Sequence, residues 1–488
     1  MNEKSELKER TLNGALWKFA EKVGMQIMQF VIQIVLARLL LPEDYGTVGL
    51  VTIFISILDI FALQGLTTAL IQKREADEKD YSTVFYMNII GALVLYAVCY
   101  LIAPFVANFY NDDLLVDIMR VLTLTVFFGA IGAVPNAILS KRLDFKKTFL
   151  RGISNIAVQG IVGVWMAYQG FGVWALVYSK LAGIMTGTIV IWGAVKWRPK
   201  LLFSATRVKM LFSYSSKVLG VSLLNTIFSN IHSLVIGKFF TKADLGYYQR
   251  GQQIPHTFMN AVDGSISEVL YPAFSLLQGT TDELKDALRR SIKQSMFIVL
   301  PSLLGLIATA DTVVRILLTE KWLPSVPFIK LSCVICAFWP LAAKTVALNA
   351  MGKSSITLKL SLISKGITIV FIFLCIKSGI YAIMLGTICA SVISALITAG
   401  YTKKELGYSL LEQIRDIGPA VLLASGMCFT VNLFNYSDLN IYMMLLVQMV
   451  SGIIIYVGGA YFLKLDEFIY LMKVIKKKVS VKRIDLEE

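Results

Sequence analysis

The sequence predicts an all-α polytopic membrane protein of about fourteen transmembrane helices, built as two parallel six-helix repeats plus two C-terminal helices. Three observations lead to this class. Hydrophobic residues make up 56% of the chain and charged residues 16%, whereas charged residues form about one-quarter of a typical soluble domain. Apolar runs of about twenty residues, long enough to cross a hydrocarbon core of about 30 Å, recur along the whole chain. Similar loops also recur about 200 residues apart.

The expected spans follow the apolar runs in chain order: 13–40, 46–70, 82–109, 114–139, 148–169, 172–195, 211–237, 250–276, 294–318, 326–350, 357–377, 380–400, 417–435 and 440–463. The span at 250–276 is the least apolar, because it contains His256, Asn260, Asp263 and Glu268. We interpret it as a helix that lines a cavity. Met1–Glu9 is polar and the first apolar run is too long for a signal peptide, so no cleavable signal is expected.

Basic residues are distributed unevenly between alternate loops. Counted in this way, 34 Lys and Arg residues lie on the side that holds both termini and 8 lie on the opposite side. Because cytoplasmic loops carry the excess of Lys and Arg, we expect both termini in the cytoplasm. The net charge of +15 is then explained by orientation and by attraction to anionic membrane lipids, and no nucleic-acid partner is expected.

Two pairs of loops indicate an internal repeat. Ala37–Gly46 resembles Gly237–Gly246, and Gly172–Leu176 resembles Gly379–Ile383. A repeat that contains six spans preserves orientation, so the halves are parallel, as in many transporters. We expect an N-terminal lobe at 1–200, a C-terminal lobe at 201–402, two additional helices at 403–465 and a basic cytoplasmic tail at 466–488.

Short loops argue against an enzyme. No predicted loop exceeds about twenty-five residues, which leaves no room for a soluble catalytic or nucleotide-binding domain. All six cysteines fall within predicted spans, and Cys333 and Cys336 lack the two further ligands of a structural zinc site. We therefore expect a non-enzymatic transporter with no metal and no cofactor other than a coupling ion, Na⁺ or H⁺.

Basic residues inside spans are candidate binding residues, since a charge in the membrane interior is costly and generally functional. Five occur, at Lys22, Arg120, Lys180, Lys217 and Lys344. Lys22, Lys180 and Lys217 lie near span ends, so their alternative role is to reach the membrane interface. Lys344 has apolar neighbours on both sides and is the stronger candidate.

Polar residues form one stripe on each of two repeat-related spans. The first span carries Gln26, Gln29 and Gln33, and the seventh carries Asn225, Ser229 and His232. At helical spacing, each set lies on one face. We expect both stripes to face an aqueous cavity. The alternative is a polar contact between helices.

Two acids and two bases complete the candidate site. Asp59 and Asp263 lie deep in repeat-related spans, where a carboxylate can carry a proton or bind Na⁺. The alternative is that each pairs with a buried lysine. Arg38 and Lys238 occupy equivalent positions at the expected outer mouth of the cavity.

Several segments carry a family resemblance: Gly14–Trp17, Leu36–Gly46, Ala69–Lys73 with Tyr81–Phe85, and Gly172–Leu176. With these, the chain resembles the oligosaccharide flippases of the multidrug/oligosaccharidyl-lipid/polysaccharide (MOP) superfamily, and within it the lipopolysaccharide and teichuronic-acid exporter branch. The resemblance implies a MATE-like fold in the bacterial cytoplasmic membrane. It implies that an undecaprenyl-pyrophosphate-linked oligosaccharide is flipped from the inner to the outer leaflet by alternating access, with a polysaccharide polymerase as a potential partner.

On this interpretation the in-span cations bind the pyrophosphate through charge-assisted hydrogen bonds. Three alternatives remain open. A multidrug or cation antiporter of the same superfamily would need a cavity lined by carboxylates. A fourteen-span major-facilitator exporter would need a Gly-x-x-x-Asp-Arg loop, which Gln72–Asp80 lacks. A membrane enzyme or scaffold of polysaccharide assembly is disfavoured by the short loops.

Overall fold

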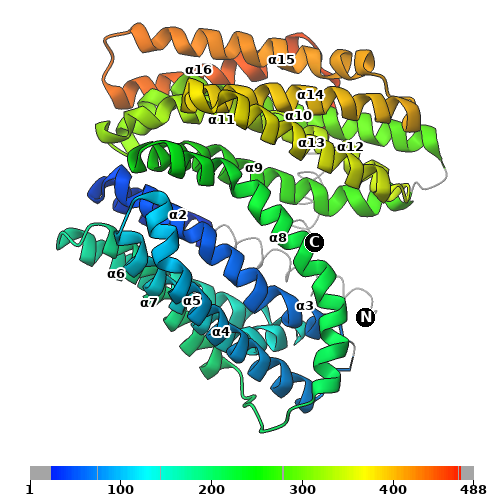
Figure 1. The fold of residues 1–488 in the computed structure, drawn as a ribbon. Coiled ribbons are helices and arrows are strands. Elements are labelled where there is room, and N and C mark those ends of the chain that lie inside the picture. Colours follow the sequence, from blue (N-terminus) through cyan, green and yellow to red (C-terminus); the bar gives the residue numbers. More distant parts are fainter. Residues whose placement is uncertain (1–23, 74, 143, 277–279, 471, 474–488) are drawn as a thin grey trace, which may run out of the picture. The chain divides into compact units, whose positions relative to one another are not determined.

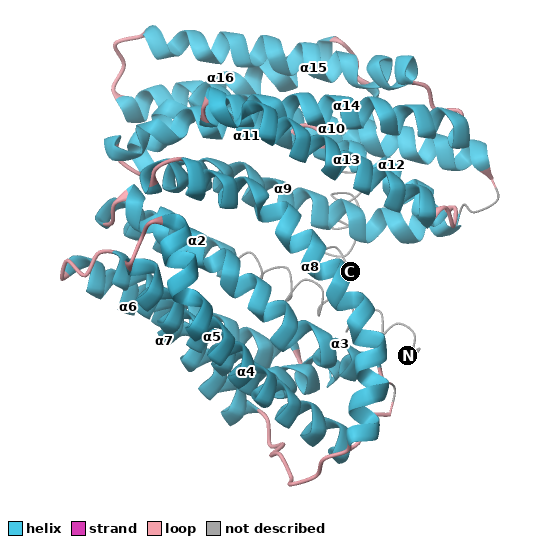
Figure 2. Ribbon diagram, in the orientation of Figure 1, coloured by secondary structure: helices cyan, strands magenta, loops and turns pink. Residues whose placement is uncertain are grey.

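The computed structural model describes residues 24–473, apart from residues 74, 143, 277–279 and 471. Every regular element in this part of the chain is a helix (Figure 2). Contacts divide the chain into two compact units, unit 1 at Met1–Gln249 and unit 2 at Arg250–Glu488. The two units are defined by contacts and the repeat by sequence similarity, so the units do not test the repeat boundary. That boundary, at 200/201, stays a prediction.

The described part of unit 1 starts with the helix Gly24–Leu39. It continues with α2 (Pro42–Asp59), a π-helical turn (Ile60–Gln64), α3 (Gly65–Gln72), α4 (Glu78–Tyr110), α5 (Leu114–Arg142), α6 (Phe145–Tyr168), α7 (Val173–Ala194) and α8 (Ala205–Phe239) (Figure 1). Helix α9 (Lys242–Leu276) begins in unit 1 and ends in unit 2.

The predicted repeat appears as two equivalent helix starts. At α2, the Leu41 amide donates to the Asp44 carboxylate at 2.9 Å. At α9, the Thr241 amide donates to the Asp244 carboxylate at 3.1 Å. In both helices an aspartate in the first turn thus accepts a hydrogen bond from the residue before the helix, which is a favourable position for a negative charge.

Unit 2 continues from α9 into α10 (Thr281–Leu317), a 3₁₀ turn (Glu320–Ser325), α11 (Val326–Cys336), a 3₁₀ turn (Trp339–Ala342), α12 (Ala343–Ala350) and α13 (Ser354–Cys375). It ends with a 3₁₀ turn (Ile376–Ser378), α14 (Ile380–Leu406), α15 (Leu410–Leu433), a 3₁₀ turn (Phe434–Tyr436) and α16 (Ile441–Phe462). The α15–α16 hairpin lies against α10 (Figure 1).

Ion pairs fix this hairpin to α10. Lys285 contacts Glu412 at 2.9 Å, and Arg289 makes two hydrogen bonds to Asp416, at 2.8 and 2.9 Å. The two basic residues are four positions apart on α10, and the two acidic residues are four positions apart on α15. Successive turns of the two helices therefore pair. We call these two pairs the α10–α15 ladder. They hold α15 against α10 within unit 2.

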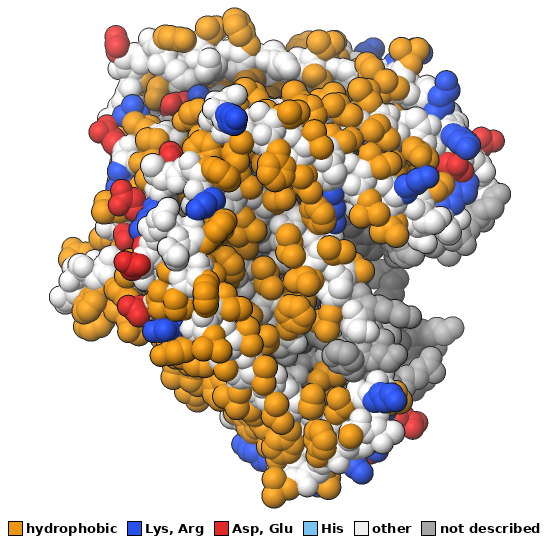
Figure 3. Space-filling model, viewed as in Figure 1, with side chains coloured by type: hydrophobic (Ala, Val, Ile, Leu, Met, Phe, Trp, Pro, Cys, Tyr) orange, Lys and Arg blue, Asp and Glu red, His pale blue; other side chains and the backbone are white. Residues whose placement is uncertain are grey.

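Twelve helical runs in the described part of the chain are long and apolar enough to cross a bilayer. Large apolar side chains also lie on their surfaces, including Phe105, which is 76% exposed, and Ile161, which is 70% exposed. Figure 3 shows apolar side chains over much of the visible face of each unit. Such surfaces belong in lipid, and the prediction of an all-α polytopic membrane protein is confirmed.

The count of fourteen spans stays a prediction. The expected span 13–40 is described only from residue 24, as the short apolar helix Gly24–Leu39. The expected span 250–276 lies within α9, which is not among the twelve apolar runs of the described residues.

One span of unit 2 changes from α-helical to 3₁₀ geometry in its middle. Helix α11 ends at Cys336, and Pro340 lies in the 3₁₀ turn before α12 begins at Ala343. Proline has no amide hydrogen and its ring disfavours a continuous α-helix. A stretch of 3₁₀ geometry within a helix often marks a functional hinge or local strain.

Candidate functional site

The structure brings two of the predicted site residues together in unit 1. The Lys180 ammonium on α7 donates to the Thr52 hydroxyl on α2 at 3.4 Å. Asp59 lies two turns further along α2, and its charge interacts with that of Lys180. The sequence analysis assigned these residues to separate roles, as a cavity cation and an ion-coupling acid. In the structure each partly compensates the charge of the other.

Asp59 occupies an unusual position in the backbone. It is the last residue of α2 and directly precedes the π-helical turn Ile60–Gln64. A single π-helical turn within a helix is rare and is frequent at functional sites, because it changes the direction of the side chains around it. Ser56, one turn earlier, bonds the carbonyl of Thr52. Thr52, Ser56 and Asp59 therefore form a polar row on one side of α2.

Lys344 is the most deeply buried of the predicted cations in the described residues. Its side chain is 1% exposed, and its ammonium donates to the Gln413 side-chain oxygen on α15 at 3.1 Å. The Gln413 amide in turn donates to the Tyr408 carbonyl at 3.2 Å. Among the described residues no carboxylate forms an ion pair with Lys344. Its charge is therefore satisfied by a neutral amide and is not balanced by an acid.

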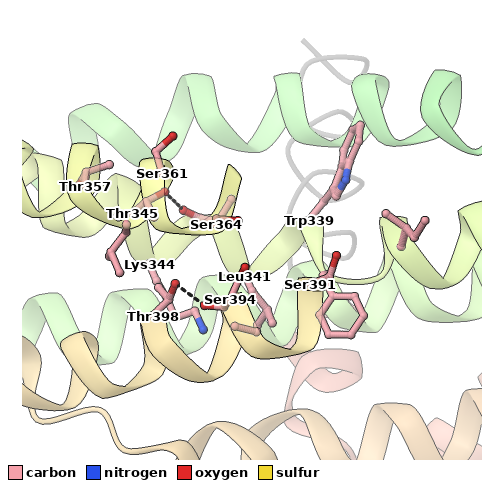
Figure 4. Close-up of a pocket in the computed structure, with 15 residues that line it drawn as sticks. Trp339, Leu341, Lys344, Thr345, Thr357, Ser361, Ser364, Ser391, Ser394 and Thr398 are labelled. Carbon is pink, nitrogen blue, oxygen red and sulfur yellow. Dashed lines mark hydrogen bonds between the residues drawn. The ribbon is translucent and has the colours of Figure 1, made fainter. Parts of the chain in front are cut away.

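A cavity of about 480 Å³ adjoins Lys344 within unit 2 (Figure 4). The segment from Ile335 to Thr345, α13 and α14 form its walls. Seven of its lining residues carry hydroxyl groups: Thr345, Thr357, Ser361, Ser364, Ser391, Ser394 and Thr398. Figure 4 shows the α13 hydroxyls on one side and the α14 hydroxyls on the other, with Lys344 between them. No Asp or Glu lines the cavity within the described part of the chain.

The predicted polar stripes are placed in unit 1. Gln26, Gln29, Asn225 and Ser229 are exposed, whereas Gln33 and His232 are half-buried. The imidazole of His232 stacks against the Tyr248 ring, with a centroid separation of 6.4 Å. That the two stripes face one aqueous cavity stays a prediction.

The two predicted outer-mouth bases differ in their surroundings. Arg38 is exposed. Lys238 donates to the Phe109 carbonyl, and its ammonium lies 4.3 Å from the centroid of the Phe109 ring. That carbonyl lies near the end of α4, where a cation is favoured by the helix dipole. Lys238 therefore has a local structural role.

Three predicted residues cannot be placed. Lys22 lies outside the described residues, and the side chains of Lys217 and Asp263 are also outside them, although their backbones lie in α8 and α9. Arg120, the fifth basic residue within a span, stacks on the Tyr100 ring at 3.9 Å, a cation–π contact that stabilises the guanidinium.

No group of three or more His, Cys, Asp or Glu side chains is arranged to hold a metal ion in the part of the chain that the structure describes. Cys333 and Cys336 are buried free thiols on α11.

The sequence analysis missed the hydroxyl cavity and the polar row on α2. A signal was present, because Thr357, Ser361 and Ser364 follow helical spacing and Pro340 interrupts the neighbouring span. Serine and threonine are common in membrane helices, however, where they bond their own backbone. Their pattern alone therefore does not distinguish a cavity from a packed interface.

Comparisons with known proteins agree with the fold. The chain matches the family described as "Polysaccharide biosynthesis protein" over residues 35–327. It is 24% identical to the teichuronic acid biosynthesis protein TuaB of Bacillus subtilis, over 67% of this chain and 68% of that protein. It is 23% identical to the lipopolysaccharide biosynthesis protein WzxC of Escherichia coli, over 67% of each chain.

Solved structures with the same fold are transporters. The lipid II flippase MurJ, in an inward closed conformation, superposes with a TM-score of 0.74 at 16% identity, over 92% of this chain and 99% of that chain. An inward-facing multidrug resistance MATE family transporter of the MOP superfamily superposes with a TM-score of 0.64 at 16% identity, over 78% and 94%. The predicted fold class is confirmed, and the family match over residues 35–327 shows that this chain belongs to the polysaccharide biosynthesis protein family.

Proposed function

We propose that this protein flips an undecaprenyl-pyrophosphate-linked oligosaccharide from the inner to the outer leaflet of the bacterial cytoplasmic membrane, for surface polysaccharide export. Relatives named for teichuronic acid and lipopolysaccharide biosynthesis support this cargo, and the MurJ-like fold supports a flippase. The observation that carries the proposal is Lys344, a buried cation without an acidic partner among the described residues.

The physical reason is the cost of moving a pyrophosphate through hydrocarbon. An ionised group in a medium of low dielectric constant is strongly destabilised unless it is paired or solvated. Lys344 places a positive charge inside unit 2, and Lys180 places another inside unit 1. In a low-dielectric interior such charges attract an anion more strongly than they do in water. We propose both as cations that serve the pyrophosphate, together with Lys22 and Lys217.

The electrostatic interaction between Asp59 and Lys180 suggests how an ion gradient drives transport. When Asp59 is ionised, its charge partly neutralises that of Lys180. A proton or Na⁺ bound at Asp59 cancels the carboxylate charge and leaves Lys180 free to attract the pyrophosphate. Ion binding and cargo binding at this place are then linked. We propose Asp263 as the repeat-related counterpart.

The competing functions each lack a specific feature. A cation or multidrug antiporter of the same superfamily would require unbalanced carboxylates. The charge of Asp59 interacts with that of Lys180, and no acid lines the cavity in the described part of unit 2. An enzyme or scaffold is disfavoured because relatives and structural neighbours are named as flippases and transporters. We propose a transporter without catalytic activity, which delivers its cargo to a polysaccharide polymerase.

The test is a flipping assay with purified full-length protein in proteoliposomes. Lipid-linked oligosaccharide extracted from the host is placed in both leaflets, and an externally added glycosidase reports the fraction that becomes accessible. Protein-containing vesicles should expose the inner-leaflet pool, and empty vesicles should not. Equal accessibility in both would refute the proposal. Transport of a cationic dye instead would favour the antiporter.

A further inference from the structure

Arg151 on α6 is a charged residue of unit 1 without a role in the site described above. It is half-buried and lies six residues after the start of α6 at Phe145, about 9 Å along the helix. An arginine at this depth can extend to the membrane interface. Arg151 instead donates to the Asn136 side-chain oxygen on α5 at 2.8 Å. Asn136 also lies six residues from the end of its helix, at Arg142, so the guanidinium stays inside the span.

No acid balances this charge among the described residues. Arg151 forms no ion pair with a described carboxylate, and no charged group interacts with it. The neutral Asn136 amide occupies one of the five N–H donors of the guanidinium. The Nε atom of Arg120 is buried without a partner, whereas no nitrogen of Arg151 is buried in this way. The remaining donors of Arg151 are therefore open to water or to a ligand.

The neighbouring helices hold the partner of Arg151 in place. Pro135 has no amide hydrogen, so it leaves the Ile131 carbonyl without its helical partner. The Trp192 indole on α7 donates to that carbonyl at 3.2 Å. This bond fixes α5 against α7 next to Asn136, and Asn136 in turn orients the guanidinium. An arginine that is oriented beforehand loses less freedom when it binds a ligand.

A second polar side chain lies next to Arg151. A β-carbon added at Gly187 on α7 would lie 3.4 Å from the side-chain amide nitrogen of Asn155 and 3.7 Å from Cγ of Arg151. Both side chains therefore extend over the same glycine, which has no side chain to separate them. A guanidinium beside a neutral amide, without an acid, suits an anion, and its planar donors match pairs of phosphate oxygens.

Lys344 occupies a comparable position in unit 2. It lies six residues before the end of α12 at Ala350, and it donates to the neutral side chain of Gln413. The predicted repeat equates α5, α6 and α7 with α12, α13 and α14. Each unit thus has one cation without a described acidic partner, at the same distance from a helix end, in the corresponding group of three helices. The loops at both helix ends are expected in the cytoplasm.

We propose that Arg151 is an anion-binding residue of unit 1, which receives the pyrophosphate of the cargo as it enters from the inner leaflet. The inference rests on the proposed function and adds a binding residue to it. A pyrophosphate that moves below the lipid headgroups loses water, and charge-assisted hydrogen bonds from the guanidinium replace part of that hydration. An anionic phospholipid presents a similar phosphate, and the experiment separates these two sources.

The test measures binding to the full-length protein in phosphatidylcholine nanodiscs. The ligands are undecaprenyl pyrophosphate and undecaprenol, which lacks the anion. Wild type should bind the pyrophosphate at least tenfold more tightly. Arg151→Gln should weaken pyrophosphate binding about tenfold, the effect of one lost charge-assisted hydrogen bond, and should leave undecaprenol binding unchanged. Arg142→Gln is the matched control, because Arg142 is exposed at the end of α5. It should change neither affinity by more than about twofold.

Asn136→Asp separates a binding role from a structural one. The carboxylate has nearly the shape of the amide and keeps the hydrogen bond to Arg151, but it balances the positive charge. Pyrophosphate binding should therefore fall about tenfold, while the thermal midpoint without ligand should equal or exceed that of wild type. If Arg151 only holds α6 against α5, this substitution should leave pyrophosphate binding unchanged, and the proposal is overturned.

The other contrary outcomes are distinguishable. If Arg151→Gln weakens both ligands equally, or binds the pyrophosphate as wild type does, the site is refuted, while flipping by wild type in proteoliposomes upholds the proposed function. If phosphatidylglycerol in the nanodiscs removes the difference between wild type and Arg151→Gln, the residue binds ordinary anionic lipid and the cargo site is refuted. If wild type neither prefers the pyrophosphate nor flips the cargo, the proposed function fails and the site fails with it.

Discussion

Gly46 and Gly246 lie against each other where α2 crosses the start of α9 within unit 1. A β-carbon added at Gly46 would lie 2.0 Å from the Lys242 carbonyl oxygen, and one added at Gly246 would lie 2.0 Å from the Pro42 carbonyl oxygen. The contact is reciprocal because the two segments are the repeated loops of the sequence. Neither side of the crossing has room for a side chain.

We predict that Gly46→Ala and Gly246→Ala each destabilise the protein by about 1–3 kcal/mol, the usual cost of overpacking a tight contact. The obstructing atoms belong to the backbone and cannot rotate away. Thermal unfolding in detergent and the yield of folded protein would measure the effect. Gly91→Ala on α4 is the control, because no atom lies within 4 Å of its added β-carbon. Equal stability of all three variants would contradict the crossing.

The second prediction concerns Lys344. Lys344→Gln should reduce flipping at least tenfold while the protein still inserts, because it removes a buried positive charge. Lys344→Arg should retain part of the activity, since the charge is kept but the compact ammonium geometry is lost. Arg38→Gln should have a smaller effect, because an exposed charge is screened by salt. Lys238→Gln should also have a smaller effect, because the Lys238 ammonium is bound to the Phe109 carbonyl. Normal flipping by Lys344→Gln would remove this residue from the site.

The third prediction concerns the electrostatic interaction between Asp59 and Lys180. Asp59→Asn or Lys180→Gln alone leaves one charge uncompensated inside unit 1, so each should lower thermal stability. The double variant should recover much of that loss, because both charges are removed together. Asp59→Asn should also abolish the dependence of flipping on an imposed proton or Na⁺ gradient. Unchanged ion dependence in this variant would place coupling elsewhere.

The fourth prediction is that the thermal stability of unit 1 depends on pH through Asp77, which lies in the loop after α3. The hydrogen bond from Arg207 holds the pKa of the Asp77 carboxyl well below its usual range. A lowered folded-state pKa stabilises the fold above the unfolded value of about 3.9, and this stabilisation is lost as the pH falls through the folded-state pKa. Arg207→Gln should therefore lower the thermal midpoint modestly at pH 7, by an amount that shrinks below about pH 4.

Arg290→Gln is the control for this experiment, since Arg290 is exposed and bonds the Asp286 backbone carbonyl. It should show no comparable dependence on pH. A midpoint difference for Arg207→Gln that stays constant down to pH 3 would show that Asp77 is not involved.

The fifth prediction concerns orientation in the membrane. In a variant whose six cysteines are replaced by serine, a cysteine at Asn111 should react with a membrane-impermeant reagent on whole cells. A cysteine at Lys146 should react only after permeabilisation, because the loops rich in Lys and Arg remain in the cytoplasm. The reverse pattern would place both termini outside the cytoplasm.

The fold class could be predicted from the sequence because each transmembrane helix is visible as a continuous apolar run. The repeat was also visible in the sequence, and in the structure Asp44 and Asp244 occupy equivalent positions in the first turns of α2 and α9. What the sequence could not provide was the partner of each polar group. Lys180 and Asp59 are on different helices far apart in the chain, and only tertiary packing brings them together.

Lys344 illustrates the same limit more sharply. Its depth was predicted from its apolar neighbours, and it is buried in the structure. Its contact with Gln413 depends on α15, one of the two helices that the sequence analysis assigned to neither repeat. The hydroxyl cavity likewise depends on a helix break whose geometry Pro340 permits but does not determine.

The α10–α15 ladder means that two basic residues of α10 depend on α15 for their acidic partners. Without α15 and α16, Arg289 would lose Asp416 and Lys285 would lose Glu412, and basic side chains would be left unpaired along α10. A variant that lacks α15 and α16 therefore needs uncharged residues at positions 285 and 289 of α10 as well.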